Sequence, residues 1–309
     1  MKVLVTGGAG FIGSHVVEAL LGAGHEVCVV DDLSSGRREH LSPDVRLHVL
    51  DIADAALAEV FDAERPDAVS HQAAQPSVAV SVREPLADAR VNVLGTLNLI
   101  TQAVRTGVRR FVFASTGGAI YGECEALPVT EAHPARPISP YGVHKLCAEH
   151  HLFAAQHLYG LRWTALRYAN VYGPRQDPHG EAGVVAIFTR AMLAGQTPTI
   201  FGDGLHTRDY VYVGDVAAAN AAALAADADG VFNIGTGTET STQQVFDTLK
   251  AQTGYWGEPR YGPPRPGDVR RIALDVSRAE QALGWRPTVS LDEGLRRTVE
   301  WFRRAWVGQ

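Results

Sequence analysis

The segment Tyr141-Gly-Val-His-Lys145 holds a phenol and an ammonium group at a spacing that suits proton transfer. On a helix, residues i and i+4 share a face, so Lys145 can lie beside Tyr141 and favour the ionised phenol. A phenol otherwise has a pKa of about 10 and is a poor base at neutral pH. Because this spacing also occurs by chance, the alternative is a surface tyrosine next to a solvated lysine.

A second chemical feature is the glycine pattern in TGGAGFIG, where Gly7, Gly10 and Gly13 follow an apolar run and open a helix. Backbone amides there can approach a pyrophosphate at the positive end of the helix. The next apolar run ends at Asp31 and Asp32, where a carboxylate can bind a ribose diol and repel a 2′-phosphate. The pattern predicts an NAD site, although glycines also serve tight turns.

Asp51 and Ile52 end the third apolar run and are placed to contact an adenine by its edge and its face. They could equally be a turn aspartate and a core isoleucine.

Six short apolar runs must position these groups, and helical patterns separate them over residues 1–170. The expected strands are Lys2–Thr6, Glu26–Asp31, Val45–Leu50, Ala68–His71, Arg110–Ser115 and Arg162–Tyr168. Near-continuous apolar strands with intervening helices predict an α/β fold, a doubly wound parallel Rossmann sheet covered on both faces.

The composition changes after Asn170 to Gly/Pro-rich segments between short helical and strand-like pieces. We therefore expect an NAD-binding domain over residues 1–170 and a smaller, irregular α/β substrate lobe over residues 171–309. An Ala-rich helical segment at 211–226 is placed to return to the first domain.

Composition excludes several classes of function. The formal net charge of −6 comes from 28 basic and 34 acidic residues without long like-charge runs, which argues against nucleic-acid and membrane surfaces. The three cysteines have no CxxC spacing and suggest neither disulfides nor zinc. Because the sequence has neither a signal-peptide pattern nor a membrane-length apolar stretch, we expect a cytoplasmic protein. His71, His144 and His206 have no metal-ligand spacing with a nearby acid, so no metal site is expected.

The motifs together resemble those of the extended short-chain dehydrogenase/reductases and, among them, the UDP-glucose 4-epimerases. The resemblance covers nearly the whole chain and rests on TGGAGFIGSH (6–15), DDLSSG (31–36), HQAAQ (71–75), Asn92, STGGAIYGE (115–123), SPYGVHK (139–145), RYANVYGPRQ (167–176), TRDYVYVGDVA (207–217) and RPGD (265–268). It implies NAD as cofactor, a UDP-sugar as substrate, and 4-epimerisation by transient oxidation and re-reduction at C4.

By this resemblance, Tyr141 takes the proton of the sugar 4-hydroxyl, while Lys145 holds the cofactor ribose and lowers the phenol pKa. Thr116, twenty-five residues before Tyr141, matches the hydroxyl that binds the reacting oxygen. The family often has three serines in this stretch, and one additional residue here leaves the choice between Thr116 and Ser115 open.

The resemblance also assigns residues that contact the ligands. Those expected at NAD are Gly7, Gly10, Phe11, Ile12, Gly13, Asp31, Asp32, Ser35, Gly36, Asp51, Ile52, Gln72, Ala73, Ala74, Gln75, Asn92, Tyr141, Lys145 and Tyr168. Those expected at the substrate are Thr116, Tyr141, Asn170, Arg208, Tyr210, Arg265, Asp268 and Ile272. Arginine forks suit a diphosphate, although Arg208 beside Asp209 could be a surface ion pair and RPGD only a turn.

Other reactions of related enzymes stay open to different degrees. Dehydratases and UDP-glucuronate decarboxylases carry an acid after the Ser/Thr position, where this chain has Gly117 and Gly118. These reactions are therefore disfavoured, whereas a UDP-glucuronate epimerase and a non-catalytic NAD-binding sensor remain alternatives.

Two further expectations rest on the resemblance. Ile272, four residues after Asp268, stands where glucose-restricted relatives carry a large aromatic, which predicts room for the N-acetyl group of UDP-GlcNAc or UDP-GalNAc. The helical segments Asp88–Thr106 and Tyr141–Tyr159 match helices that pair across a two-fold axis in relatives, so we expect a homodimer.

Overall fold

A seven-stranded parallel sheet forms the centre of the chain, with strand order β11-β6-β5-β4-β1-β2-β3. The computed structural model describes residues 1–179, 183–264 and 269–306. The strands of this sheet are β1 (Lys2–Thr6), β2 (Glu26–Asp31), β3 (Arg46–Val49), β4 (Ala68–His71), β5 (Arg110–Thr116), β6 (Arg162–Tyr168) and β11 (Gly230–Ile234). The order reverses at β1, so the predicted doubly wound sheet is confirmed.

All six predicted strands form, with small differences at their ends. β3 is one residue shorter at each end than predicted, and β5 extends to Thr116. The seventh strand, β11, was not predicted. It pairs with β6 from Gly230–Thr164 to Ile234–Tyr168 and completes this edge of the sheet.

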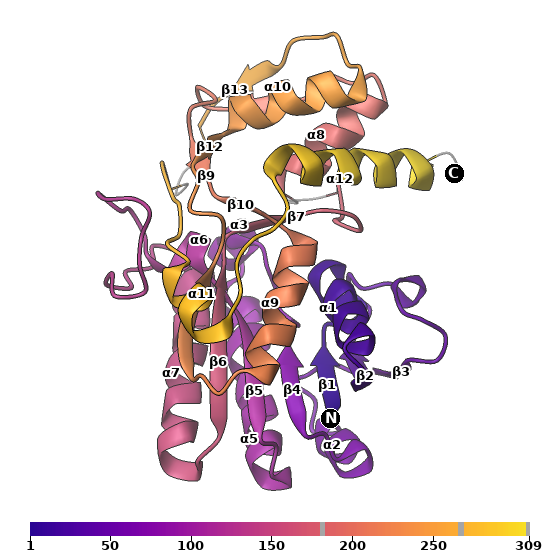
Figure 1. The fold of residues 1–309 in the computed structure, drawn as a ribbon, viewed down its shortest axis with the longest axis vertical. Helices are drawn as coiled ribbons and strands as arrows, with labels where there is room; N and C mark the ends of the chain where they lie inside the picture. The colour runs from indigo at the N-terminus through magenta and orange to yellow at the C-terminus, as the bar shows by residue number, and fades with distance from the viewer. Residues whose placement is uncertain (180–182, 265–268, 307–309) are drawn as a thin grey trace.

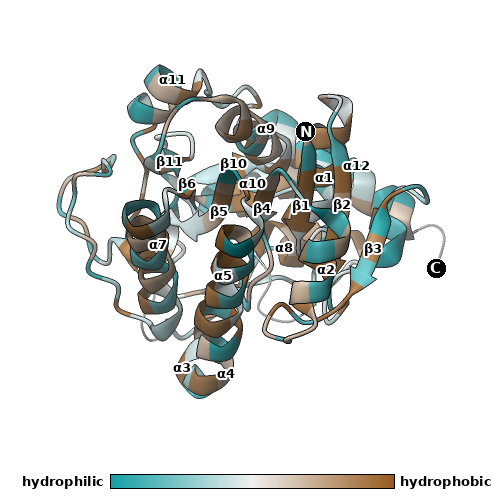
Figure 2. Cartoon of the chain, turned by 90° about the horizontal axis from the view of Figure 1, so that it is seen from below, coloured by the Kyte–Doolittle hydropathy of each residue, from teal (hydrophilic) through white to brown (hydrophobic). Residues whose placement is uncertain are grey.

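Helices cover both faces of the sheet, as Figure 2 shows from below. One face carries α2 (Leu57–Glu64), α5 (Thr96–Thr106) and α7 (Pro140–Tyr159), while α1 (Phe11–Gly22) and α9 (Val213–Ala225) pack on the other. The shorter helical segments are η1 (Arg38–His40), α3 (Val78–Arg83), α4 (Pro85–Ala89), the π-helical turn η2 (Arg90–Gly95), α6 (Gly117–Ile120) and α11 (Ser277–Leu283).

Alternation of side chains along β1 explains why its sequence is apolar throughout. Val3 and Val5 pack into the core beneath α1 and α9, whereas Leu4 packs into the core beneath α2 and α5. Successive side chains point to opposite faces of a strand, and both faces are covered here. This double burial produces the continuous apolar runs.

A smaller lobe lies above the carboxyl ends of the strands (Figure 1). Its core packs residues of α8 (Val184–Leu193), α10 (Thr242–Thr253) and α12 (Leu291–Trp306) together. Its short strands are β7 (Asn170–Tyr172), β8 (Thr199–Phe201), β9 (Thr207–Arg208), β10 (Tyr210–Tyr212), β12 (Thr240–Ser241) and β13 (Arg260–Gly262). Within the described residues, no helix is long and apolar enough to span a membrane.

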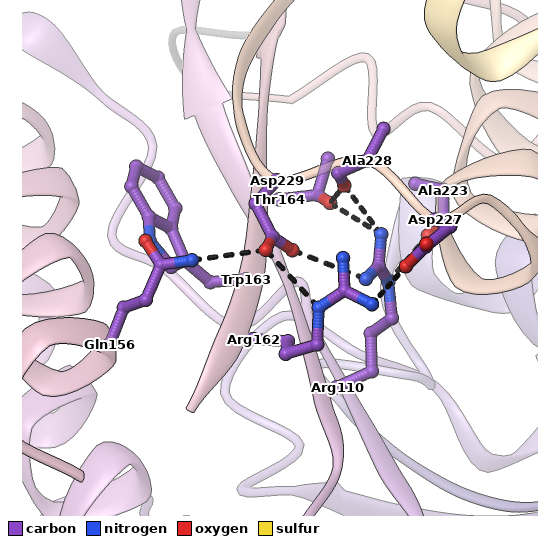
Figure 3. A network of polar contacts seen from close by, with 9 residues as sticks. All are labelled: Arg110, Gln156, Arg162, Trp163, Thr164, Ala223, Asp227, Ala228 and Asp229. Carbon is purple, nitrogen blue, oxygen red and sulfur yellow. Dashed lines mark hydrogen bonds and ion pairs between the residues drawn. The ribbon is translucent and has the colours of Figure 1, made fainter. Parts of the chain in front are cut away.

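Two elements that follow residue 210 in the sequence, α9 and β11, belong to the sheet domain and not to the smaller lobe. The Ala-rich segment forms α9, which contacts α1, and the next strand, β11, joins the sheet beside β6. Arg110 links these late segments to β5 and β6 at the amino ends of the strands (Figure 3). Its guanidinium donates to the carbonyls of Ala223 at 2.9 Å and Ala228 at 2.5 Å, and it pairs with Asp229 at 3.3 Å.

We expect Arg110→Ala to lower the free energy of unfolding by about 3 kcal/mol, because it leaves the Ala223 carbonyl without its side-chain donor and removes one donor each from the Ala228 carbonyl and the Asp229 carboxylate. Its side chain is 8% exposed. Arg162 is the matched control because it binds Asp229 in the same network but is 42% exposed. Arg162→Ala should cost about 1 kcal/mol or less. Urea unfolding followed by circular dichroism measures both, and equal losses would contradict this assignment.

Candidate active site

A cavity of about 1190 Å³ lies at the carboxyl ends of the strands and is lined by residues of both lobes. Typical small-molecule pockets hold about 300–1,000 Å³, so this cavity is large enough for an extended ligand or for two ligands. The residues predicted from sequence that line it are Gly7, Gly10, Phe11, Ile12, Gly13, Asp31, Asp32, Ser35, Asp51, Ile52, Gln72, Ala73, Ala74, Gln75, Ser115, Thr116, Tyr141, Tyr168, Asn170 and Arg208.

The head of α7 brings Tyr141 to the cavity. Ser139 caps this helix by accepting a hydrogen bond from the amide of Gly142 at 3.2 Å, and Pro140 occupies its first turn. The amide of Tyr141 donates to Ser81 Oγ at 3.1 Å, which holds the helix start against α3. Tyr141 therefore has a fixed backbone position.

Thr116 and Ser115 have different surroundings at the end of β5. The Thr116 hydroxyl interacts with the Tyr141 phenol. The Ser115 hydroxyl instead donates to Glu149 Oε1 at 2.5 Å, and Glu149 also binds the guanidinium of Arg167 at 2.7 Å. These surroundings favour Thr116 over Ser115 as the hydroxyl beside Tyr141, because the Ser115 hydroxyl already donates to a buried ion pair.

Lys145 is buried one helical turn after Tyr141. Its ammonium donates to the Ala114 carbonyl at 2.9 Å and lies 4.8 Å from the centroid of the Phe113 ring. Burial lowers the pKa of Lys145 to about 8, while the charges of Asp88 and Glu149 act in the opposite direction. Unlike Tyr141, Lys145 is not among the residues that line the cavity.

The phenol pKa differs from the sequence-based expectation. Burial raises the pKa of Tyr141 above its usual range, the charge of Asp88 raises it further, and the interaction with Thr116 lowers it. The expected lowering by Lys145 is wrong for this structure, since the ammonium is held on Ala114 and lies 6.0 Å from the centroid of the Tyr141 ring.

The loop between β1 and α1 with the start of this helix, residues 7–13, is the glycine loop, and it packs too tightly for side chains at some of its glycines. Gly7 has a φ of +64°, and a Cβ there would lie 2.6 Å from the amide nitrogen of Ala73. A Cβ on Gly13 would lie 1.9 Å from the carbonyl oxygen of Gly7. The loop therefore presents bare backbone at the start of α1, where helix geometry favours an anion.

Asp31 supports this loop from the end of β2. Its carboxylate accepts hydrogen bonds from the amides of Ala9 and Leu33, each at 2.9 Å, and burial raises its pKa. Gly36 does not line the cavity but packs on Asp31, because a Cβ there would lie 2.7 Å from Asp31 Oδ1. Asp32 is exposed and accepts from the Ser34 hydroxyl at 2.6 Å.

Two polar networks hold the remaining cofactor-side residues. Asn92 is buried and lies outside the cavity lining, where its amide donates to the carbonyl of Gln75 at 3.0 Å. The Tyr168 hydroxyl donates to Gln72 Oε1 at 3.2 Å and accepts from Asn220 at 2.7 Å. Asn92 thus fixes the loop after β4 and does not itself line the cavity.

The smaller lobe brings only part of the predicted substrate set to the cavity. Asn170 and Arg208 line it, whereas Tyr210 is buried against Tyr172. Ile272 is 2% exposed and packs in the sheet core instead of lining the cavity. In this structure its side chain therefore does not border the space that an N-acetyl group would occupy. The two remaining predictions, Arg265 and Asp268, lie outside the described residues.

Sequence reasoning missed three buried polar residues around this site: Asp88, Glu149 and His71. Glu149 follows Lys145 by four residues, a spacing that signals a shared helix face, but nothing local marks its partner Arg167. In the described part of the chain, no group of three or more His, Cys, Asp and Glu side chains is placed to hold a metal ion.

Comparisons with known proteins agree with this geometry. The family model described as the NAD dependent epimerase/dehydratase family matches residues 3–235. The UDP-glucose 4-epimerase of Mycolicibacterium smegmatis is 49% identical over 309 aligned positions, covering 98% of this chain and 99% of that protein.

Two solved structures are similar over the full chain. The UDP-glucose 4-epimerase of Thermotoga maritima, solved with UDP-glucose, is 53% identical with a TM-score of 0.98, covering 99% of this chain and 100% of that one. The Thermus thermophilus UDP-glucose 4-epimerase, solved with NAD, is 49% identical with a TM-score of 0.94 and the same coverage of 99% and 100%. This chain therefore belongs to the NAD-dependent epimerase/dehydratase family.

Proposed function

We propose that this chain is an NAD-dependent 4-epimerase of UDP-sugars that interconverts UDP-glucose and UDP-galactose. The observation that carries the proposal is that Tyr141, Thr116 and the glycine loop line one cavity. The similar enzymes solved with UDP-glucose and with NAD support both ligands.

The cofactor side fits a dinucleotide. The bare backbone at Gly7, Gly10 and Gly13 suits a pyrophosphate at the start of α1, and the acidic tip of β2 suits the hydroxyls of the adenosine ribose. When bound, NAD supplies a reversible acceptor for the hydrogen on C4 of the sugar. We propose that Lys145, protonated below its pKa of about 8, turns from the Ala114 carbonyl to donate to the nicotinamide ribose when NAD is bound.

Tyr141 and Thr116 provide the proton chemistry in this proposal. Thr116 hydrogen-bonds the 4-oxygen of the sugar, and Tyr141 removes its proton and later returns it. Because the same base works in both directions, no second acid is needed. In the smaller lobe, Asn170 and Arg208 are the proposed contacts to the diphosphate, with Arg265 and Asp268 assigned by resemblance alone.

The residues after Thr116 favour epimerisation over elimination. A Cβ on Gly117 would lie 2.4 Å from Leu274 Cδ1, so this position is closed to a larger side chain. Gly118 lines the cavity, and its Cβ would stand 3.6 Å from Asn170 Oδ1. Neither glycine can protonate a leaving hydroxyl, which dehydration would require.

The direct test starts with the protein as purified. Denaturation should release about one NAD per chain, and the native protein should convert UDP-galactose to UDP-glucose without added nucleotide. Bound NAD without conversion would reject this substrate, and UDP-GlcNAc and UDP-glucuronate would be assayed next. Failure with all three sugars would favour a non-catalytic NAD-binding protein.

Thr116→Val should lower kcat about 100-fold, because the isosteric side chain removes the hydrogen bond to the reacting oxygen. Ser115→Ala is the neighbouring control. It removes the hydrogen bond to Glu149 and should cost about 1 kcal/mol of stability with kcat within about threefold of the parent. Steady-state kinetics and thermal unfolding measure both variants. The reverse pattern would assign the catalytic hydroxyl to Ser115.

We also propose a homodimer formed through the segment Asp88–Thr106 and α7. Large apolar side chains are exposed on η2 and α7 and on the neighbouring α3 and α4, namely Leu94 at 57%, Phe153 at 61%, Leu158 at 66%, Val82 at 63% and Leu86 at 86%. Exposed apolar patches of this kind mark protein interfaces. Sedimentation of a monomer at micromolar concentration would refute the dimer.

A further inference from the structure

A buried carboxylate lies between α4 and α7. Asp88 has no exposed surface, and its Oδ1 accepts hydrogen bonds from Gln75 Nε2 at 2.5 Å and from Asn92 Nδ2 at 3.0 Å. Its Oδ2 contacts Nδ1 of His144. A buried charge is costly unless it is paired and hydrogen-bonded, so these three donors together stabilise Asp88.

The three donors come from three segments that meet beside the candidate active site. Residues 72–77, which follow β4 and line the cavity, form the cavity loop. Gln75 lies in this loop, and its backbone forms two hydrogen bonds with the side chain of Asn92 on η2, at 3.0 and 3.2 Å. His144 lies on α7 directly before Lys145 and three residues after Tyr141. Asp88 therefore ties the cavity loop to the head of the helix that carries both reactive groups.

The charge of Asp88 also acts on these two groups. Burial raises the pKa of Tyr141, and Asp88 adds to that effect. Burial lowers the pKa of Lys145, and Asp88 opposes that effect. A negative charge at this place thus favours the ammonium form of Lys145, while on Tyr141 it favours the neutral phenol over the phenolate that acts as the base.

Other charged groups of the elements that pack against α7 are paired elsewhere. Glu149 of α7 binds Arg167 of β6 and also raises the pKa of Lys145. His71 of β4, whose pKa burial lowers, lies between the hydroxyls of Thr6 and Thr96. The short helix α6 contributes no charged residue. On α3, α4, η2 and α5 the charged side chains form ion pairs, namely Arg83 with Glu84, Arg90 with Asp51 and Arg105 with Asp62.

We propose that Asp88 and His144 are positioning residues for Tyr141 and Lys145, which hold the cavity loop against α7 and keep a fixed negative charge beside the two reactive groups. The catalytic meaning of this inference rests on the proposed epimerase function. The position and charge of Asp88 are properties of the fold and can be tested without a sugar substrate.

The first test uses the small number of lysines. The chain has only Lys2, Lys145 and Lys250, so ¹³Cε-lysine NMR resolves the Lys145 signal, which Lys145→Arg identifies. We expect Asp88→Asn to lower the pH midpoint of this signal by about one pH unit, because the charge that favours the ammonium is removed. Glu84→Gln, an exposed charge at the start of α4, should leave the midpoint unchanged.

A folded Asp88→Asn protein whose Lys145 midpoint stays within about 0.2 pH unit of the parent would overturn the proposal, since a purely structural role would not move it. Should this variant not fold, Asp88→Ser carries the same expectation.

The second test concerns His144 and reads activity. His144→Ala should lower kcat/KM for UDP-galactose about tenfold, and His144→Asn should restore most of it, because asparagine can place an N–H near the position of Nδ1. Equal losses in both variants would overturn the role of His144. A parent protein that does not convert UDP-galactose would instead contradict the proposed function, and the lysine midpoint would still decide the role of Asp88.

Discussion

Tyr141→Phe should lower kcat by at least about 1,000-fold and leave NAD binding unchanged. The variant removes the one hydroxyl that the proposal assigns to proton transfer and keeps the ring. The backbone contact of residue 141 with Ser81 and the cap by Ser139 are also kept. Single-turnover assays with UDP-galactose, together with the amount of NAD released on denaturation, measure both parts of the prediction.

The control is a second buried tyrosine. Tyr172 lies in the core of the smaller lobe, is 1% exposed and does not line the cavity. Tyr172→Phe should keep kcat within about threefold of the parent. A Tyr141→Phe enzyme as fast as the parent would show that another group is the base.

Gly13→Ala should abolish NAD retention and reduce activity below about 1% of the parent. The added methyl group would stand 1.9 Å from the Gly7 carbonyl oxygen, and both atoms belong to the backbone framework of the loop. Neither can rotate away, so the loop must open and the amides at the start of α1 must move. NAD content after gel filtration and activity with added NAD test this expectation.

Gly22→Ala is the matched control, because it lies in the same helix and, apart from its chain neighbours and its own helix backbone, no atom lies within 4 Å of the new Cβ. Alanine has the higher helix propensity, so this variant should be as stable as the parent or more stable by about 0.5–1 kcal/mol, with normal NAD content. Equal loss of NAD in both variants would mean that α1 tolerates no substitution and that Gly13 has no special place.

The sheet could be predicted from sequence because its strands are buried on both faces and end in characteristic turns. The exception is β11, which begins with glycine and has partly exposed residues at its start. Nothing within Gly230–Ile234 specifies that it pairs with β6, some sixty residues earlier in the chain. Only the complete packing of α9 and β6 determines that partner.

Predicted residues line the cavity where a characteristic residue type coincides with the end of a strand or the start of a helix. The glycine loop, Asp31, Thr116 and Tyr141 all line one cavity because parallel strands end at one edge of the sheet. Spacing alone could not reveal burial, which reverses the expected direction of the Tyr141 pKa. Nor could it reveal Asp88, whose donors come from three separate segments.

The late arrival of β11 has a consequence for synthesis on the ribosome. Once the chain up to Tyr168 has left the exit tunnel, the first six strands can form. β6 then has an open edge, and the guanidinium of Arg110 lacks its partners, the carbonyls of Ala223 and Ala228. Open edges of apolar strands pair readily with other chains. Until Ile234 has left the exit tunnel, the nascent protein therefore exposes the unpaired edge of β6. The speed of translation between Tyr168 and Ile234 determines how long that edge stays exposed.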